Sequence, residues 1–158
     1  MIKVLFFCLG NICRSPMAEA VFRNLLKEEG IEDQFFVDSA GTSDEEEGNP
    51  VHPGTKDRLA REGIDVKGMY SRPLQESDLS FDYIIGMDTS NMKNFKRFDQ
   101  GRSKATIAKL LSFTEEEGDI ADPWYTGDFE QTYQDVYCGC QALLEVIKKN
   151  EKIVGKHE

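Results

Sequence analysis

A continuous apolar segment at the N-terminus ends at a cysteine, and this feature constrains the fold most. Residues 2–7, IKVLFF, carry bulky and β-branched side chains with one charge at Lys3, and Cys8 follows directly. Such a run without polar alternation is typical of a strand buried on both faces, as in a parallel sheet. Pro16 then stands where a first helical turn tolerates proline, and apolar residues continue at helical spacing to Gly30. The opening of the chain therefore predicts a strand, a loop and a helix.

Further strands and helices alternate along the chain. The pattern predicts strands at 35–43 and 81–88, and helices at 55–62, from about residue 90, and at 129–149, whereas 106–113 fits a short strand or a helix leading into one. This alternation implies an α/β fold with a parallel sheet and right-handed crossovers. The 158 residues contain no repeat and no low-complexity linker, so we expect a single domain over 1–158. Ligands of such folds bind beyond the carboxyl ends of the strands, where Cys8 lies.

Composition narrows the class of function. A net charge of −10 argues against nucleic-acid and anionic-membrane partners, which need a basic face. No segment approaches the roughly 18 apolar residues of a membrane span, and MIKVLFF lacks the pattern of a signal peptide. The four cysteines are then best interpreted as reduced thiols of a cytoplasmic protein. An anionic substrate would have to be captured by local features, against the average field.

The loop after the first predicted strand has the residues of a phosphate site. A loop between a strand and a helix N-terminus can turn several backbone N–H groups inward and bind an anion. Arg14 adds a planar set of donors suited to phosphate oxygens. The site is not of the nucleotide-binding type, because the pattern G-x-x-x-x-G-K-[ST] is absent from the sequence. The predicted phosphate-binding residues are Leu9, Gly10, Asn11, Ile12, Cys13, Arg14 and Ser15.

Cys8 would form the floor of this loop. A helix N-terminus and a neighbouring cation lower the pKa of a thiol, so we expect a thiolate, which Ser15 could stabilise with a hydrogen bond. A lone cysteine at a strand end is more often a buried core thiol, but its setting beside Gly10, Asn11 and Arg14 favours a nucleophile. A thiolate among phosphate-binding groups implies attack on phosphorus and a cysteinyl-phosphate intermediate. No metal or cofactor is expected.

This chemistry also needs a proton donor. A phenolate leaving group of pKa about 10 departs slowly at neutral pH unless its oxygen is protonated. The segment DPWY offers Asp122, which Pro123 biases towards an extended conformation, with Trp124 and Tyr125 as walls for an aromatic group. The alternative is an ordinary turn aspartate followed by two surface aromatics.

Four motifs together resemble the low-molecular-weight protein tyrosine phosphatases. CLGNICRSPMAEA at 8–20, DSAGTS at 38–43, MDTSN at 87–91 and DPWY at 122–125 stand in family order across the whole chain. The resemblance implies a three-layer fold in which a four-stranded parallel sheet has helices on both faces. It implies phosphotyrosine-containing proteins as substrates, with a monomer or weak homodimer as the expected state.

The resemblance also implies residue roles. Cys8 matches the nucleophile, Arg14 the binder of the phosphoryl oxygens, and Asp122 the general acid and then general base. Asn11 and Ser39 match positions that brace the loop, while Ser15 matches the hydroxyl beside the nucleophile. Asp88 matches a supporting acidic residue, but it could equally be a helix cap. Cys13 matches a thiol that can pair with Cys8 under oxidation.

Three positions depart from the family pattern. Many members carry Trp beside the pocket after DSAGTS, whereas here the stretch is DEEEG with Glu45 nearest that position. Glu45–Glu47 is typical of a solvated loop, but near the pocket it would disfavour acidic phosphopeptides. Met69 stands where some members have a His that supports Asn11, and Trp124 replaces a frequent Tyr.

Three rival functions remain open from the sequence. An arsenate reductase would need relay cysteines, but Cys138 and Cys140 fall in the last predicted helix, where i and i+2 side chains diverge. A phosphoarginine phosphatase would resemble this chain with Thr in place of Ile12, whose apolar bulk favours an aromatic substrate. A phosphotyrosine-binding module without turnover would not need both Arg14 and Asp122.

Overall fold

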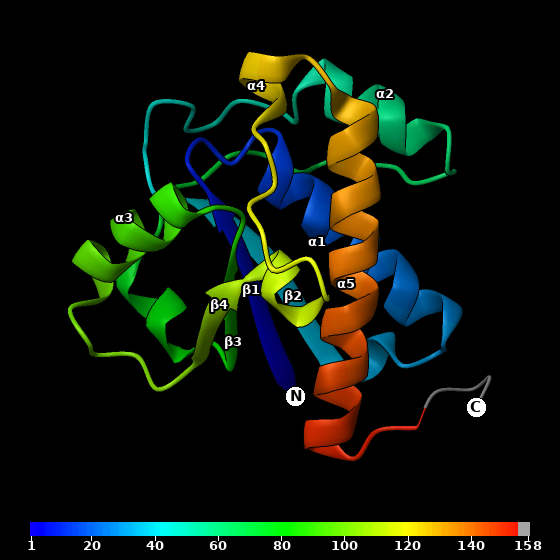
Figure 1. Cartoon of the computed structure of the whole chain (residues 1–158), viewed down its shortest axis with the longest axis vertical. Coiled ribbons are helices and arrows are strands. Elements are labelled where there is room, and N and C mark those ends of the chain that lie inside the picture. The colour runs from blue at the N-terminus through cyan, green and yellow to red at the C-terminus, as the bar shows by residue number, and fades with distance from the viewer. Residues whose placement is uncertain (155–158) are drawn as a thin grey trace.

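A four-stranded parallel sheet forms the centre of the computed structural model, which describes residues 1–154 (Figure 1). The strands are β1 (Ile2–Cys8), β2 (Phe35–Gly41), β3 (Tyr83–Gly86) and β4 (Thr106–Lys109), in the order β2-β1-β3-β4. Every neighbouring pair is parallel, so β1 pairs with β2 on one side and β3 on the other. The predicted α/β class with a four-stranded parallel sheet is confirmed.

Helices cover both faces of the sheet. The α-helices are α1 (Arg14–Glu28), α2 (Pro53–Ala60), α3 (Thr89–Asp99), α4 (Pro123–Thr126) and α5 (Phe129–Glu151). Short 3-10 turns are η1 (Glu32–Gln34), η2 (Glu76–Ser80) and η3 (Leu110–Phe113). Figure 1 shows α1 and α5 on one face and α3 on the other. The ambiguous segment 106–113 divides into the edge strand β4 and the turn η3.

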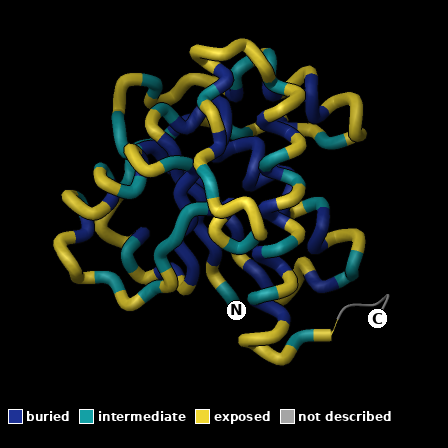
Figure 2. The backbone as a smooth tube through the Cα atoms, viewed as in Figure 1, coloured by how far each residue is buried: buried dark blue, intermediate teal, exposed yellow. Residues whose placement is uncertain are grey.

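Strand β1 is buried on both faces, as its continuous apolar sequence predicts. Val4 and Phe6 belong to the apolar layer under α1 and α5, whereas Leu5 and Phe7 belong to the layer under α3. All four side chains are completely buried, and Phe7 stacks on Phe95 with ring centroids 4.9 Å apart. Each such burial is worth about 1.5–3 kcal/mol, so both layers depend on this strand. Figure 2 shows the buried strands inside a largely exposed outer surface.

The carboxyl ends of β1 and β2 lie side by side at the edge of the sheet. Cys8 is in register with Gly41, and the backbone N–H of Thr42 donates to the Cys8 carbonyl at 2.9 Å. A Cβ at Gly41 would lie 2.8 Å from the Leu9 carbonyl oxygen, so only glycine permits this approach. The loop after β1 and the loop after β2 are thereby held together. Within residues 1–154, no helix has the length and apolarity needed to cross a membrane.

Candidate active site

The segment 9–13 joins β1 to α1, and Asn11 fixes its shape. Asn11 adopts a left-handed backbone conformation with φ 56°, which asparagine tolerates better than most residues. Its buried amide nitrogen donates to Ser15 Oγ at 2.7 Å and to Ser39 Oγ at 3.0 Å. Its amide oxygen accepts a hydrogen bond from the backbone N–H of Arg72 at 3.1 Å. The turn is therefore held from three directions, from α1, from β2 and from the segment that contains Arg72.

A buried carboxylate continues this network behind the loop. Ser39 Oγ donates to Glu19 Oε1 at 2.6 Å, and Glu19 also pairs with Arg23 at 2.7 Å. Burial raises the pKa of Glu19 above its ordinary value, although Arg23 opposes the shift. The sequence analysis missed Glu19, because a glutamate between two alanines in a helix is normally expected to be exposed. Its position within the CLGNICRSPMAEA motif was the available signal.

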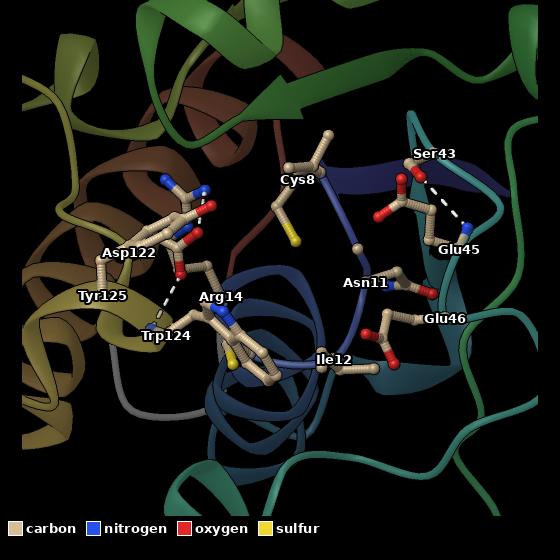
Figure 3. A pocket seen from close by; sticks show the side chains of 13 residues that line it. Cys8, Asn11, Ile12, Arg14, Ser43, Glu45, Glu46, Asp122, Trp124 and Tyr125 are labelled. Atoms are coloured by element: carbon tan, nitrogen blue, oxygen red, sulfur yellow. Dashed lines mark hydrogen bonds and ion pairs between the residues drawn. The ribbon is translucent and has the colours of Figure 1, made fainter.

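Cys8 and Ser15 are neighbours at the bottom of the pocket. Cys8 Sγ lies 3.0 Å from Ser15 Oγ, and both residues are buried. Because Ser15 Oγ already accepts a hydrogen bond from the Asn11 amide, its own hydrogen is free to point towards the sulfur. Figure 3 shows Cys8 Sγ directed into the pocket between Arg14 and the loop that carries Glu45.

Arg14 is a buried cation whose contacts hold the guanidinium mainly through Nη1. Its Nη1 donates to Asp88 Oδ2 at 2.6 Å and to the Ile120 carbonyl at 2.9 Å, and its Nη2 lies 3.4 Å from Asp122 Oδ2. Burial lowers the pKa of Arg14, but the negative charges of Cys8 and the two aspartates outweigh it and raise the pKa overall. The Nε atom is buried and, among the described residues, has no hydrogen-bond partner. Such groups are rare in native proteins and often mark a ligand site.

Asp88 combines the two interpretations that the sequence left open. Its carboxylate accepts from the backbone N–H of Asn91 at 2.7 Å and so caps α3. The same carboxylate pairs with Arg14 at 2.6 Å. One side chain therefore begins a helix and orients the buried arginine.

Asp122 and two aromatic side chains form one wall of the pocket. Asp122 has the extended conformation that Pro123 imposes, and it caps α4 by accepting from the Trp124 N–H at 3.0 Å. Trp124 and Tyr125 also line the pocket and remain 55% and 79% exposed. Wide exposure beside a polar cavity suits side chains that contact a substrate.

The structure brings most of the predicted site residues around one pocket. Its lining includes Cys8, Leu9, Gly10, Asn11, Ile12, Cys13, Arg14, Ser43, Glu45, Glu46, Asp122, Trp124 and Tyr125. Ser15 and Ser39 lie behind the loop, where they contact Asn11. Ser43 and Glu46 are lining residues that the sequence analysis did not single out. Within residues 1–154, no group of three or more His, Cys, Asp or Glu side chains could hold a metal ion.

The four cysteines occupy different environments. Cys13 lines the same pocket as Cys8, and burial together with the charge of Cys8 raises its pKa to about 12. Cys138 is exposed and Cys140 is buried in α5, with its thiol pointing to the Ala18 carbonyl. Neither of these last two lines the pocket, and the exposure of one and burial of the other agree with side chains that diverge at i, i+2 spacing.

Fold and site together define an α/β protein whose strand–loop–helix unit presents a thiol and a buried arginine to one pocket. The chain belongs to the low molecular weight phosphotyrosine protein phosphatase family, a family of hydrolases, because the family model matches residues 3–153.

Comparison with known proteins agrees with this membership. The low molecular weight protein-tyrosine-phosphatase YfkJ of Bacillus subtilis is 46% identical over 156 residues, 97% of this chain and all of that protein. The crystal structure of YfkJ superimposes with a TM-score of 0.91 over 95% of this chain and 96% of that one. The Drosophila arginine phosphatase DARP is 30% identical, with a TM-score of 0.85 over 93% of this chain and 98% of that one. The fold is therefore shared by relatives named for two different phosphoamino acids.

Proposed function

We propose that this protein hydrolyses phosphotyrosine on proteins through a cysteinyl-phosphate intermediate. The observation that carries the proposal is the buried Arg14 Nε without a partner, on a side chain that lines the same pocket as the Cys8 thiol. A phosphoryl oxygen would supply the missing acceptor. The N–H groups at the N-terminus of α1 add further donors and a favourable dipole for the same anion.

In the first step, Cys8 Sγ attacks phosphorus while the bond from phosphorus to the tyrosine oxygen breaks. Asp122 gives its proton to that leaving oxygen, so tyrosine departs as a neutral phenol. Arg14 and the loop N–H groups bind the equatorial oxygens, on which negative charge is spread in the transition state. Asp88 and the Ile120 carbonyl hold the guanidinium in place through its Nη1.

In the second step, a water molecule attacks phosphorus and passes a proton to Asp122. The sulfur–phosphorus bond breaks, and Cys8 leaves as a thiolate while inorganic phosphate is released. Ser15, 3.0 Å from the sulfur, would donate a hydrogen bond to the departing thiolate. No metal or cofactor takes part in this scheme.

An aromatic substrate fits the walls of the pocket better than phosphoarginine does. Ile12, Trp124 and Tyr125 supply apolar and aromatic surface around the opening. The phosphoarginine alternative has support in the fold shared with DARP, so the two substrates have to be compared directly.

The decisive experiment compares the wild type with Cys8→Ser. We expect the wild type to hydrolyse p-nitrophenyl phosphate and a phosphotyrosine peptide, and Cys8→Ser to bind both without turnover. Hydrolysis of a phosphoarginine protein at a higher kcat/KM than a phosphotyrosine protein would favour the alternative substrate. Binding without turnover by the wild type would reject an enzymatic function.

We also propose that Cys13 protects Cys8 against irreversible oxidation. Peroxide would convert the Cys8 thiolate to a sulfenic acid, and Cys13 would then form a disulfide with it and expel water. Both thiols line one pocket, and the raised pKa of Cys13 keeps it protonated and less reactive until Cys8 is oxidised. After peroxide treatment, thiol reductant should restore activity to the wild type but not to Cys13→Ser. Equal recovery of both proteins would contradict this role.

The domain organisation, the cellular location and the oligomeric state also follow from the sequence as proposals. We infer that residues 1–158 fold as one domain, that the protein acts in the cytoplasm, and that it is a monomer or a weak homodimer. Analytical ultracentrifugation over a range of concentrations tests the oligomeric state, and a single cooperative unfolding transition is expected of one domain.

A further inference from the structure

The wall of the pocket opposite Asp122 carries negative charge. Glu45 and Glu46 line the pocket and lie across it from Asp122 and Trp124, with their carboxylates directed towards the cavity (Figure 3). They belong to the loop that leaves the end of β2. Glu47, the next residue, is exposed and does not line the pocket.

This acidic wall is fixed to the phosphate loop. The backbone N–H of Ser43 donates to the Leu9 carbonyl at 3.0 Å, and Ser43 Oγ accepts from the Glu45 N–H at 3.1 Å. Glu46 Oε2 accepts from Asn49 Nδ2 at 2.6 Å, which orients its carboxylate. The position of the two glutamates is therefore set by the same contacts that shape the site.

Glu46 lies directly against the loop that would hold the phosphate. A Cβ built on Gly10 would lie only 3.3 Å from Glu46 Cγ. At this distance from the loop, the charge acts on whatever residue follows or precedes the bound phosphoryl group. The Debye length is about 8 Å at physiological ionic strength, so screening does not remove the effect.

Neither carboxylate is neutralised by the protein itself. Throughout residues 1–154, Glu45 and Glu46 form no ion pair with any Lys, Arg or His, and the chain as a whole carries a net charge of −10. At the bottom of the same pocket, however, Arg14 keeps a buried donor unused on a side chain that is 3% exposed. The site therefore combines a guanidinium at the bottom of the pocket, with a donor available to a phosphoryl group, and an anionic rim.

We infer that Glu45 and Glu46 select phosphotyrosine segments that carry Lys or Arg within one or two residues of the phosphotyrosine. This inference rests on the proposed function. An extended peptide advances about 3.3–3.6 Å per residue, so these flanking side chains reach the rim while the phosphoryl group contacts Arg14. Basic flanks are attracted to the two glutamates, and acidic flanks are repelled by both glutamates and by the net charge of the protein.

The test uses three phosphotyrosine peptides that differ only in whether the flanking residues are Lys, Ser or Glu. For the wild type we expect kcat/KM to be about three- to tenfold higher for the Lys peptide than for the Glu peptide, the combined effect expected of two exposed charge pairs. In the double variant E45Q/E46Q this ratio should approach one. The control E47Q removes one negative charge from the same loop, away from the pocket, and should keep the wild-type ratio.

Two results would overturn the inference. One is a wild-type ratio near one at low salt, and the other is an equal loss of the ratio in E47Q and E45Q/E46Q. Raising the salt concentration to 0.5 M should reduce the wild-type ratio, about as far as the shorter screening length predicts.

Failure of the proposed function is recognised separately. If the wild type turns over none of the peptides, the Kd values of the same three peptides for Cys8→Ser, with and without E45Q/E46Q, still measure the selectivity of the rim. A Kd preference for the Lys peptide that disappears in E45Q/E46Q supports the inference, and unchanged Kd values reject it.

Discussion

Asn11 determines the shape of the phosphate loop in two ways. Its left-handed backbone turns the chain, and its amide ties the turn to Ser15, Ser39 and the backbone of Arg72. Glycine would satisfy only the first requirement, and alanine would satisfy neither. The two substitutions therefore separate the contribution of the backbone from that of the hydrogen bonds.

We expect Asn11→Ala to be less stable than Asn11→Gly by about 0.5–1 kcal/mol, since left-handed strain exceeds the entropic advantage of alanine. Both variants lose the amide contacts, so both should lose kcat to a similar extent. Urea unfolding and p-nitrophenyl phosphate kinetics measure the two effects. If the two variants are equally stable, backbone strain at this position is unimportant.

Asp122 caps a helix and is also the proposed proton donor. Asn at this position keeps the cap but cannot act as an acid. Asp122→Asn should lower kcat/KM, which reports the step that expels the leaving group, by about 10²–10⁴-fold for phenyl phosphate and by less for p-nitrophenyl phosphate, whose leaving group needs less protonation. Steady-state kinetics on both esters test this. Equal losses on the two substrates would assign Asp122 a purely positioning role.

At the scale of elements, His52 connects three helices to the phosphate loop. Its Nδ1 accepts from the Gly54 N–H at 3.0 Å and caps α2, while its backbone N–H donates to the Ile12 carbonyl at 2.9 Å. Its ring stacks on Phe129 at the start of α5 and meets the edge of Trp124 in α4. The aromatic wall of the pocket is thereby tied to the packing of the helices.

Gly54 leaves the space that this junction needs. A Cβ at this position would lie 2.4 Å from the Phe129 ring, so Gly54→Ala must displace the ring and its stack with His52. We expect a loss of about 1–3 kcal/mol in the free energy of unfolding, and a higher KM through the shifted Trp124. Gly118→Ala is the control, because the nearest contact there is an ordinary 3.8 Å. Similar effects of both substitutions would show that the junction is not tightly packed.

The sequence predicts those elements that are determined by their own residues, but not those that depend on contacts with distant segments. The strand, loop and helix around Cys8 follow from a buried apolar run and helix signals, so they were predicted. The division of 106–113 into β4 and η3 depends on pairing with β3, which no local pattern contains. One of the contacts that hold Asn11 comes from the backbone N–H of Arg72. Almost every residue has a backbone N–H, so the sequence does not indicate which one takes part.

The acidic loop illustrates the same limit for the site. The sequence shows the charges of Glu45–Glu47 and leads us to expect Glu45 beside the pocket, but it does not show that Glu46 lines the pocket while Glu47 does not. The orientation of Glu45 and Glu46 depends on their contacts with Ser43 and Asn49. Ser43 is in turn held against the loop after β1 by its hydrogen bond to the Leu9 carbonyl.

At the scale of the whole molecule, burial keeps several weak acids protonated. It raises the pKa of Cys13 and of Tyr133 to about 12, and it raises the pKa of Cys140 as well. In the unfolded chain these groups ionise at lower pH, thiols near 8.5 and tyrosine near 10. The folded state therefore binds more protons in alkaline solution, and stability must fall as pH rises.

We expect the free energy of unfolding to be fully retained below about pH 8.5 and to decline steadily towards pH 12. Each group contributes a slope of about 1.4 kcal/mol per pH unit once it is ionised in the unfolded chain only. Cys140→Ala should make the decline shallower by one such slope near pH 10–11, whatever its effect at neutral pH. The exposed Cys138 provides the control, and an identical slope in Cys138→Ala and Cys140→Ala would contradict the assignment.

Cys8, the proposed nucleophile, lies at the end of the strand on which both apolar layers depend, whereas the rim of the pocket lies on the exposed loop after β2 and on the short helix α4. This arrangement separates a part of the molecule that tolerates few substitutions from a part that tolerates more. A substitution in the strand that ends at Cys8 disturbs both apolar layers, so few replacements there are compatible with the fold. A substitution at the exposed Glu45, in the loop after β2, costs the core little. Lineages that inherit this scaffold are therefore free to diverge in the proteins they recognise while the reaction itself stays the same.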